Sequence, residues 1–339
     1  MKDKRQRRKN ALWGGIEKGQ RIHMRIDRKE TAARLLKQDD ILILCHRNPD
    51  GDTLGSGYGL HFALKQLGKR SRVLCSDPIP PKMEYLRGKE SFSDFPPRFV
   101  ATVDIADEQL FGDALSPYRG KVDLAIDHHP SNSLFAKGTL LHAEAAATCE
   151  IIYHLLLEMG VTVTQQIADC LYTGIATDTG CFKFANVTPD THRIAASLIE
   201  IGCQFQQINK CLFQSKTLGM IELERQVLNT LEFHDENRIA LICVSLQMLR
   251  ETGVSEAELD GISGIPRQIE GVQVGVTIKE RAQNEYKLSV RSSELLDASK
   301  FCALFGGGGH ARAAGCTICG SLPQVREKVL TALQEALPQ

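Results

Sequence analysis

Short apolar runs alternate with amphipathic stretches through the first half of the chain. Residues 54–67 and 146–159 have the helical pattern, and the second stretch stops at Gly160. Strands that alternate with helices are typical of a parallel sheet covered by helices, whose ligands bind beyond the carboxyl ends of the strands. We therefore predict an α/β domain over residues 26–205. The expected strands are residues 41–45, 72–75, 99–103 and 122–126.

The second half of the chain has a different order of elements. Residues 206–230 have a helical pattern with no proline, so we predict a helical linker there. A length of 339 residues also favours two domains over one. We expect a smaller α/β domain over residues 231–337. Its expected elements are strands at 238–244, 272–279 and 286–291, a helix at 295–305, a glycine run, and a final strand and helix.

Composition adds little to this outline. Hydrophobic residues make up 42% and charged residues 24%, with a formal net charge of +0, as in ordinary globular proteins. The exception is a basic extension, residues 1–25, which we interpret as a flexible solvated tail; an arm that contacts RNA or lipid phosphates is the alternative. No apolar run reaches the roughly 20 residues that span a bilayer, so we expect a cytoplasmic protein without membrane contact.

The chain contains 11 cysteines, an odd number that favours reduced thiols over a disulfide framework. Cys316 and Cys319 have a spacing also found in zinc and redox sites. A zinc site would need a second ligand pair, and a redox pair would have to open a helix. Because both residues lie in an expected strand, we predict two packed thiols.

Four polar clusters stand along the first domain, and three of them directly follow an expected strand. Singly, each has an ordinary explanation: Asp104 or Asp178 could cap a helix or turn, and adjacent histidines could lie exposed in a loop. Together they would place many carboxylates along one sheet edge, where divalent cations would relieve the repulsion. Oxygen and nitrogen ligands without thiolate favour Mn²⁺ or Mg²⁺, with Co²⁺ or Fe²⁺ as substitutes. The clusters are His46, Asp50 and Asp52; Asp104; Asp127-His128-His129; and Asp178.

In this order the clusters resemble the motifs of the DHH phosphoesterase superfamily, which takes its name from the Asp127-His128-His129 triplet. The run Gly306-Gly307-Gly308-Gly309-His310 resembles the hallmark of its DHH-associated C-terminal domain. Segments 174–180 and 186–189 are similar to the bacterial nanoRNase and pAp phosphatase group. The resemblance spans residues 35–318, which is nearly the whole chain.

The resemblance implies a role for each residue of the four polar clusters. His46 and Asp50 would bind one metal ion, and Asp104 would bridge it to a second. Asp127 would orient a neighbouring histidine, and His129 would contact the scissile phosphate. Two such metals would activate a hydroxide for attack on phosphorus. The ligands of the second metal would be Asp52, His128 and Asp178.

The glycine run would be a flexible linker by default. A helix and an apolar strand bound it tightly, however, and this favours a loop whose backbone N–H groups approach an anion. His310 and Arg291 would supply further phosphate donors, with Arg312 a weaker candidate. A site divided between two domains would suit short substrates.

We therefore expect hydrolysis of very short oligoribonucleotides to nucleoside 5′-monophosphates, with pAp as a second candidate substrate. The other enzymatic hypotheses are a manganese pyrophosphatase or polyphosphatase, a RecJ-type exonuclease, and a hydrolase of linear or cyclic dinucleotides. A protein that binds RNA or nucleotides with structural metals is the non-enzymatic alternative. The glycine run argues against a pyrophosphatase, and the lack of a wide basic or aromatic stretch argues against RecJ. The sequence does not fix the oligomeric state, and a homodimer is one alternative.

Overall fold

A computed structural model of the chain describes residues 24–92, 94–255, 259 and 261–337. Of the basic extension, only Met24 and Arg25 lie within these ranges. Residues 1–23, which carry the predicted flexible tail, lie outside the described residues. The chain divides into two compact units between Ser215 and Lys216. No described helix is both long enough and apolar enough to cross a membrane.

The first unit contains a six-stranded parallel sheet in the order β1-β6-β5-β4-β2-β3. Strand β3 pairs with one edge of β2, and β4, the next strand in the chain, pairs with the other edge of β2. The direction in which strands are added to the sheet therefore reverses between β2 and β4. Such a reversal opens a crevice at the carboxyl ends of the two strands. The four expected strands are present, and two short ones were missed. The strands are β1 Met24–Arg25, β2 Ile41–Cys45, β3 Ser71–Cys75, β4 Phe99–Val103, β5 Leu124–Asp127 and β6 Gly138–Leu141.

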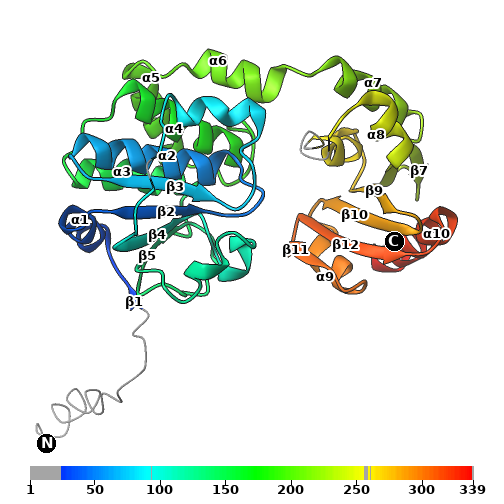
Figure 1. Ribbon diagram of the computed structural model, residues 1–339. Coiled ribbons are helices and arrows are strands. Elements are labelled where there is room, and N and C mark those ends of the chain that lie inside the picture. The colour runs from blue at the N-terminus through cyan, green and yellow to red at the C-terminus, as the bar shows by residue number, and fades with distance from the viewer. Residues whose placement is uncertain (1–23, 93, 256–258, 260, 338–339) are drawn as a thin grey trace, which may run out of the picture. The chain divides into compact units, whose positions relative to one another are not determined.

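Helices α2, α3 and α4 cover one face of this sheet (Figure 1). Two short 3₁₀ turns, Glu108–Phe111 and Ser116–Tyr118, lie in the chain that covers the other face, where Phe111 and Leu115 are fully buried. A further 3₁₀ turn, Pro81–Arg87, packs on α2. The helices of this unit are α1 Arg28–Lys37, α2 Gly51–Gln66, α3 Thr148–Glu158, α4 Gln165–Asp178, α5 Pro189–Glu200 and α6 Phe205–Asn209, followed by a π-helical turn at Lys210–Gln214.

Glycines let α2 pack unusually close to α4. A Cβ atom on Gly55 would lie 2.4 Å from the carbonyl oxygen of Cys170 in α4. A Cβ atom on Gly174 would lie 2.2 Å from Cys149 Sγ and 2.7 Å from Asp52 Oδ1. Because real Cβ atoms do not approach other atoms so closely, these two positions require glycine. The contact brings Asp52, in the first turn of α2, beside α4, the helix that ends at Asp178.

The segment predicted as a linker is helical, but it belongs to both units. The π-helical turn after α6 ends the first unit, whereas α7, Leu218–Leu228, opens the second. Leu223 and Val227 of α7 are fully buried against the second sheet. The division at Ser215 therefore differs from the predicted boundaries at residues 205 and 231.

The second unit contains a mixed six-stranded sheet in the order β11-β12-β10-β9-β8-β7, in which only β8 and β9 run parallel. Helices α9 and α10 pack on one face of the sheet, and α7 and α8 pack on the other. This arrangement confirms the predicted α/β class in both units. The elements are β7 Glu232–His234, β8 Ile239–Val244, α8 Leu246–Thr252, β9 Val274–Ala282, β10 Glu285–Ser292, α9 Ala298–Ala303, β11 Gly308–His310, β12 Ala313–Cys319 and α10 Leu322–Ala336.

Cys316 and Cys319 both lie in β12, as expected from the sequence. Cys316 is buried in the core of the second unit, but Cys319 is exposed. Side chains three residues apart on a strand point to opposite faces, so the two thiols cannot share one packing environment. The prediction of two packed thiols is wrong for Cys319.

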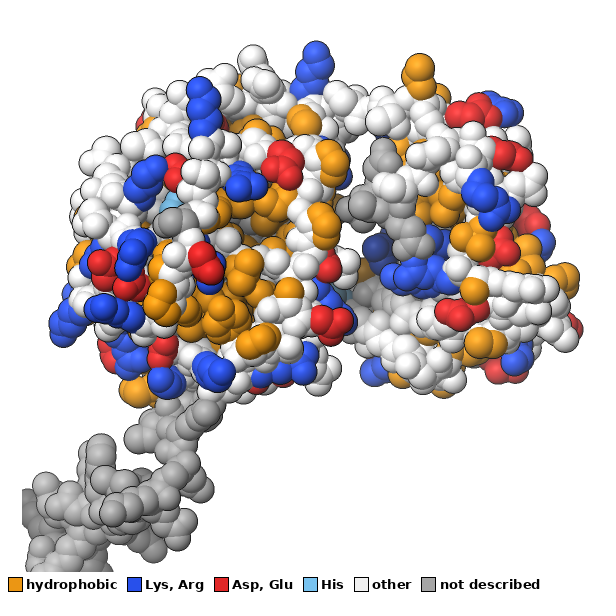
Figure 2. Space-filling model, in the orientation of Figure 1, with side chains coloured by type: hydrophobic (Ala, Val, Ile, Leu, Met, Phe, Trp, Pro, Cys, Tyr) orange, Lys and Arg blue, Asp and Glu red, His pale blue; other side chains and the backbone are white. Residues whose placement is uncertain are grey.

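On the face of the first unit visible in Figure 2, Lys and Arg side chains lie interspersed with Asp and Glu. This mixture accords with the formal net charge of +0.

Candidate metal centre

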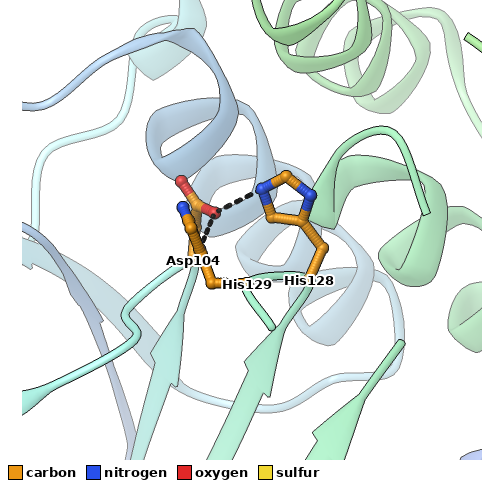
Figure 3. Close-up of side chains that lie close together, drawn as sticks. All are labelled: Asp104, His128 and His129. Atoms are coloured by element: carbon orange, nitrogen blue, oxygen red, sulfur yellow. Dashed lines mark ion pairs between the residues drawn. The ribbon is translucent and has the colours of Figure 1, made fainter. Parts of the chain in front are cut away.

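The polar clusters meet at the carboxyl ends of β2, β4 and β5. His46 directly follows β2, Asp104 directly follows β4, and Asp127 is the last residue of β5. Asp178, the last residue of α4, completes the cluster. In Figure 3 dashed lines join one carboxylate oxygen of Asp104, Oδ1, to the rings of His128 and His129. Ligand atoms lie within 4.8 Å of one another in each of three groups: His46, Asp50 and Asp104; Asp52, His128 and Asp178; and Asp104, His128 and His129.

His46 is oriented to bind a metal through Nε2. Its Nε2 lies 3.6 Å from Asp50 Oδ1 and 3.5 Å from Asp104 Oδ2. Its Nδ1 lies 2.8 Å from the carbonyl oxygen of Arg47. A carbonyl accepts a hydrogen bond, so Nδ1 carries a proton and Nε2 is the ring atom that would bind a cation.

His128 repeats this arrangement on the other side of Asp104. Its Nε2 lies 3.3 Å from Asp178 Oδ2, 3.6 Å from Asp104 Oδ1 and 4.0 Å from Asp52 Oδ2. Its Nδ1 lies 3.1 Å from the carbonyl oxygen of Ala145 and donates its proton there. Both histidines thus donate from Nδ1 to a carbonyl oxygen and turn Nε2 toward a shared set of carboxylates.

Asp104 contributes one oxygen to each side of the centre, Oδ2 toward His46 and Oδ1 toward His128. Its backbone is left-handed, with a φ of 59°, which is uncommon outside glycine but is tolerated by aspartate. The hydroxyl of Thr148 donates to Oδ1 at 2.9 Å. Backbone conformation and hydrogen bond together hold the carboxylate between the two histidines.

Asp50 and Asp52 also cap helices, a role that the sequence had suggested only for Asp104 and Asp178. Asp50 is the N-cap of α2, and its Oδ1 accepts from the backbone N–H groups of Asp52 and Thr53. The fully buried Asp52 accepts from Thr148 N at 2.6 Å and Cys149 N at 2.9 Å in the first turn of α3. The N-cap of α3 has no side-chain cap of its own, so Asp52 supplies it. Capping therefore accompanies the ligand geometry and positions both carboxylates.

Electrostatics shows that this donor set suits divalent cations. Burial, with repulsion from Asp104 and Asp50, raises the pKa of Asp52 well above its ordinary value. Burial, with repulsion from Asp52 and Asp104, does the same to the pKa of Asp178. Burial lowers the pKa of His46, but hydrogen bonds to Asp104 and Asp50 outweigh it and raise the value to about 11. The carboxylates thus repel one another, and bound cations would offset this repulsion.

Asp127 pairs with His129 rather than with His128. Asp127 Oδ1 lies 2.8 Å from His129 Nδ1, and its Oδ2 accepts from Asn132 Nδ2 at 2.6 Å. Burial lowers the pKa of His129, but the hydrogen bond to Asp127 and the charge of Asp104 outweigh it and raise the value to about 9. The carboxylate behind the centre, expected to orient a neighbouring histidine, therefore contacts the third residue of the triplet.

The glycine run of the second unit is only partly a loop. Gly306 has a φ of 73°, but residues 308–310 form the edge strand β11, which pairs with residues 313–315 of β12. A Cβ atom on Gly307 would lie 2.2 Å from the carbonyl oxygen of Gly315, and one on Gly309 would lie 2.7 Å from that of Ala313. Backbone conformation and close packing thus account for three of the four glycines. Gly306 and Gly308 both have open space at the Cβ position, but only Gly308 of the two has a backbone φ that other residues adopt.

The basic candidates of the second unit lie on β10 and at the end of β11. Arg291 of β10 is opposite Ala313 of β12 and Gly275 of β9, and His310 is exposed on β11. Arg312 has a structural contact, since its Nη1 donates to the carbonyl oxygen of Ser293 at 2.6 Å.

Sequence reasoning missed several residues that hold the metal centre together. Thr148 contacts Asp104 and Asp52, and Asn132 contacts Asp127. Asn186 Nδ2 donates to the carbonyl oxygens of Ala146 and Asp178. Thr148 is the first residue of α3 and lies near the start of the predicted helix 146–159. Nothing in the spacing of Asn132 or Asn186 indicates their contacts.

Comparison with known proteins defines the class. The family model described as the DHH family, N-terminal domain, matches residues 40–175, and that of the DHHA1 domain matches residues 239–339. The chain is 35% identical over 320 residues to the bifunctional oligoribonuclease and PAP phosphatase NrnA of Thermus thermophilus, a match that covers 92% of this chain and 95% of that relative. The chain therefore belongs to the DHH family.

Solved structures share the fold. An exopolyphosphatase-related protein from Bacteroides fragilis aligns with a TM-score of 0.82 at 22% identity, over 91% of this chain and 95% of that one. The exonuclease RecJ bound to manganese aligns with a TM-score of 0.56 at 14% identity, over 92% of this chain and 95% of that one. At these identities the likeness concerns the fold alone.

Proposed function

We propose that the protein hydrolyses the phosphoester bonds of very short oligoribonucleotides and releases nucleoside 5′-monophosphates. Hydrolysis of pAp to AMP would be a second activity of the same centre. The observation that carries this proposal is the pair of ligand groups that meet at Asp104 and His128. The Thermus thermophilus relative, named for both activities, is similar to this chain across nearly its whole length.

The two groups would hold two divalent cations. His46 and Asp50 would bind one cation, Asp104 would be shared, and the other ligands would be Asp52, His128 and Asp178. Manganese is our first choice because the ligands are oxygen and imidazole nitrogen, with Mg²⁺ or Co²⁺ as substitutes. Cations in such pairs supply Lewis acidity toward a phosphoryl oxygen and lower the pKa of water.

His129 would serve the substrate directly. Its Nδ1 is engaged by Asp127, so only Nε2 remains for another partner. With its pKa raised to about 9, the ring carries a proton at neutral pH and would donate from Nε2 to a phosphoryl oxygen. Asp127 would preserve this charge and the orientation of the ring.

The second unit would bind the remainder of the substrate. Arg291 and His310 would donate to phosphate oxygens, and the backbone of Gly306, Gly307, Gly308 and Gly309 would approach an anion. The space beside Gly306 and Gly308 is open. We also propose that the enzyme acts in the cytoplasm. Its 11 cysteines are all free thiols, which suits a reducing compartment.

The test is a hydrolysis assay with the full chain and Mn²⁺. Diribonucleotide, triribonucleotide, long RNA, pAp, cyclic dinucleotide and polyphosphate would be compared, with product release followed by chromatography. His128→Asn should abolish activity, as should EDTA, while His234→Asn, on β7 of the second unit, is the matched control. We expect monophosphate from the short RNAs and much slower turnover of long RNA.

Two results would overturn the proposal. Undiminished turnover in EDTA or by His128→Asn would exclude the assigned centre. A preference for polyphosphate or long RNA over short RNA and pAp would exclude the assigned substrate.

A further inference from the structure

Phe184 is the most exposed aromatic side chain among the described residues, with 58% of its surface accessible. A single exposed phenylalanine is ordinary on a protein surface. Its place in the chain makes this one different, because it follows the candidate ligand Asp178 by six residues. The turn between them explains how the ring is held.

This turn has a strained backbone. Gly180, Cys181 and Phe182 all adopt left-handed conformations, with φ values of 55°, 58° and 63°. Such a conformation costs about 1–2 kcal/mol at each residue other than glycine. Strain of this kind persists where surrounding contacts enforce it, and it concentrates at functional sites.

Those contacts tie the turn to the metal centre. The backbone N–H of Phe184 donates to the carbonyl oxygen of Thr179 at 3.0 Å. Asn186, two residues later, donates to the carbonyl oxygen of Asp178 at 3.1 Å. The ring of Phe182 stacks on His192 at 5.5 Å between centroids. The backbone on both sides of Phe184 is therefore anchored to Thr179 and Asp178.

The ring of Phe184 rests on Gly180. A Cβ atom at Gly180 would lie 2.4 Å from both Cε1 and Cζ of the ring, so the glycine leaves the space that the ring occupies. Two peptide units separate Gly180 from Asp178, which places their Cα atoms at most about 7.6 Å apart. An aromatic surface, more than half of it exposed, is thus held against the turn that directly follows the candidate ligand Asp178.

We propose that Phe184 stacks against a nucleobase of the substrate while the adjoining phosphate lies at the metal centre. This inference rests on the proposed function and adds a residue that determines what is bound there. Stacking on an aromatic ring accepts any base, because every base has a π face. A substrate without a base beside the scissile phosphate would lose this contact.

The kinetic test compares Phe184→Ala, Phe184→Leu and Phe184→Trp on diadenylate and on its two monoabasic analogues. Loss of one stacked base corresponds to about a 5- to 150-fold change. We expect Phe184→Ala and Phe184→Leu to raise KM for diadenylate by this factor with kcat little changed, and Phe184→Trp to retain a KM near that of the wild type. On the analogue that lacks the stacked base, the rise in KM caused by Phe184→Ala should be at least fivefold smaller than on diadenylate. Phe233→Ala, which removes another exposed ring, is the control.

A second measurement does not depend on turnover. The chain has one tryptophan, Trp13, so Trp13→Phe combined with Phe184→Trp reports on position 184 alone. With Mg²⁺ present, AMP should quench this fluorescence and ribose 5-phosphate should not. Equal quenching by both, or quenching by neither, would overturn the stacking proposal.

The two proposals fail in different ways. Hydrolysis of short RNA by the wild type, with Phe184→Ala affecting all substrates equally, would refute stacking and leave the proposed function standing. Base-dependent quenching without hydrolysis of short RNA would support the stacking contact and refute the proposed function.

Discussion

Asp127 Oδ1 lies 2.8 Å from Nδ1 of His129, two residues further along the chain, and also accepts from the backbone N–H of His128 at 2.9 Å. The Nδ1 atom of His128 instead donates to the carbonyl oxygen of Ala145. The two adjacent histidines therefore differ in the hydrogen-bond partner of Nδ1, which is a carbonyl oxygen for His128 and a carboxylate for His129. A neutral partner leaves His128 suited to bind a cation, whereas a carboxylate partner favours the charged form of His129.

Replacing Asp127 with asparagine should therefore change the pH dependence as well as the rate. The amide carries no charge, so the pKa of His129 should fall from about 9 toward its ordinary value of 6.5. We expect kcat to fall by about 10–100-fold and its alkaline limb to move to lower pH. Rate profiles and imidazole nitrogen NMR would measure both effects. Asp113→Asn is the control, and an unmoved alkaline limb would contradict the assigned role.

Gly174→Ala should weaken metal binding without touching a ligand side chain. The new methyl group would lie 2.2 Å from Cys149 Sγ of α3 and 2.7 Å from Asp52 Oδ1 of α2, so α4 would have to move away from both helices. Overpacking of this kind costs about 1–3 kcal/mol of stability. Denaturant unfolding and Mn²⁺ titration calorimetry would measure the two losses.

The double variant Cys149→Ala with Gly174→Ala removes only the contact with sulfur. This double variant should be more stable than Gly174→Ala. Its Mn²⁺ affinity should stay as low as that of Gly174→Ala, because the new methyl group still crowds Asp52. Full recovery of Mn²⁺ affinity would show that the spacing of α2 and α4 does not position Asp52. Cys149→Ala alone is the reference for this comparison.

Adjacent glycines of the second unit should respond differently to alanine. At Gly308 nothing lies within 4 Å of the Cβ position, so Gly308→Ala should change stability by less than about 0.5 kcal/mol. We expect its KM for short RNA to rise severalfold, because the methyl group would obstruct an approaching phosphate. Gly307→Ala meets backbone and should cost about 1–3 kcal/mol. An unchanged KM for Gly308→Ala would leave the glycine run with a packing role alone.

His61 should make the first unit sensitive to acid. Burial lowers its pKa below 6.5, and its Nδ1 lies 2.8 Å from Ser71 Oγ. The unfolded chain then takes up a proton below pH 6.5 more readily than the folded protein does. The contribution of His61 to stability is present above pH 6.5 and is lost as pH falls toward its folded pKa.

The variant His61→Gln removes this titration. With Mn²⁺ saturating, its free energy of unfolding should fall less steeply than that of the wild type between pH 6.5 and pH 5. Urea unfolding at several pH values would measure the difference. Parallel curves for the two proteins would contradict the assignment.

Much of the centre follows from local sequence. His46, Asp104 and Asp127 each stand where an apolar strand ends, and the carboxyl ends of parallel strands share one edge of a sheet. Repulsion among the carboxylates then predicts cations without any coordinates. The strands that were missed, Met24–Arg25 and Gly138–Leu141, are too short to produce a clear periodic pattern.

Only the tertiary structure shows which of these side chains contact one another. Whether Asp127 pairs with His128 or His129 depends on side-chain directions at the end of β5, and the amides that Asp52 caps lie 96 and 97 residues away in sequence. The glycine run matched a phosphate-binding pattern, yet contacts with β12 account for Gly307 and Gly309. A sequence specifies which groups each element carries, whereas hydrogen bonds and packing between distant segments form only once the chain has folded.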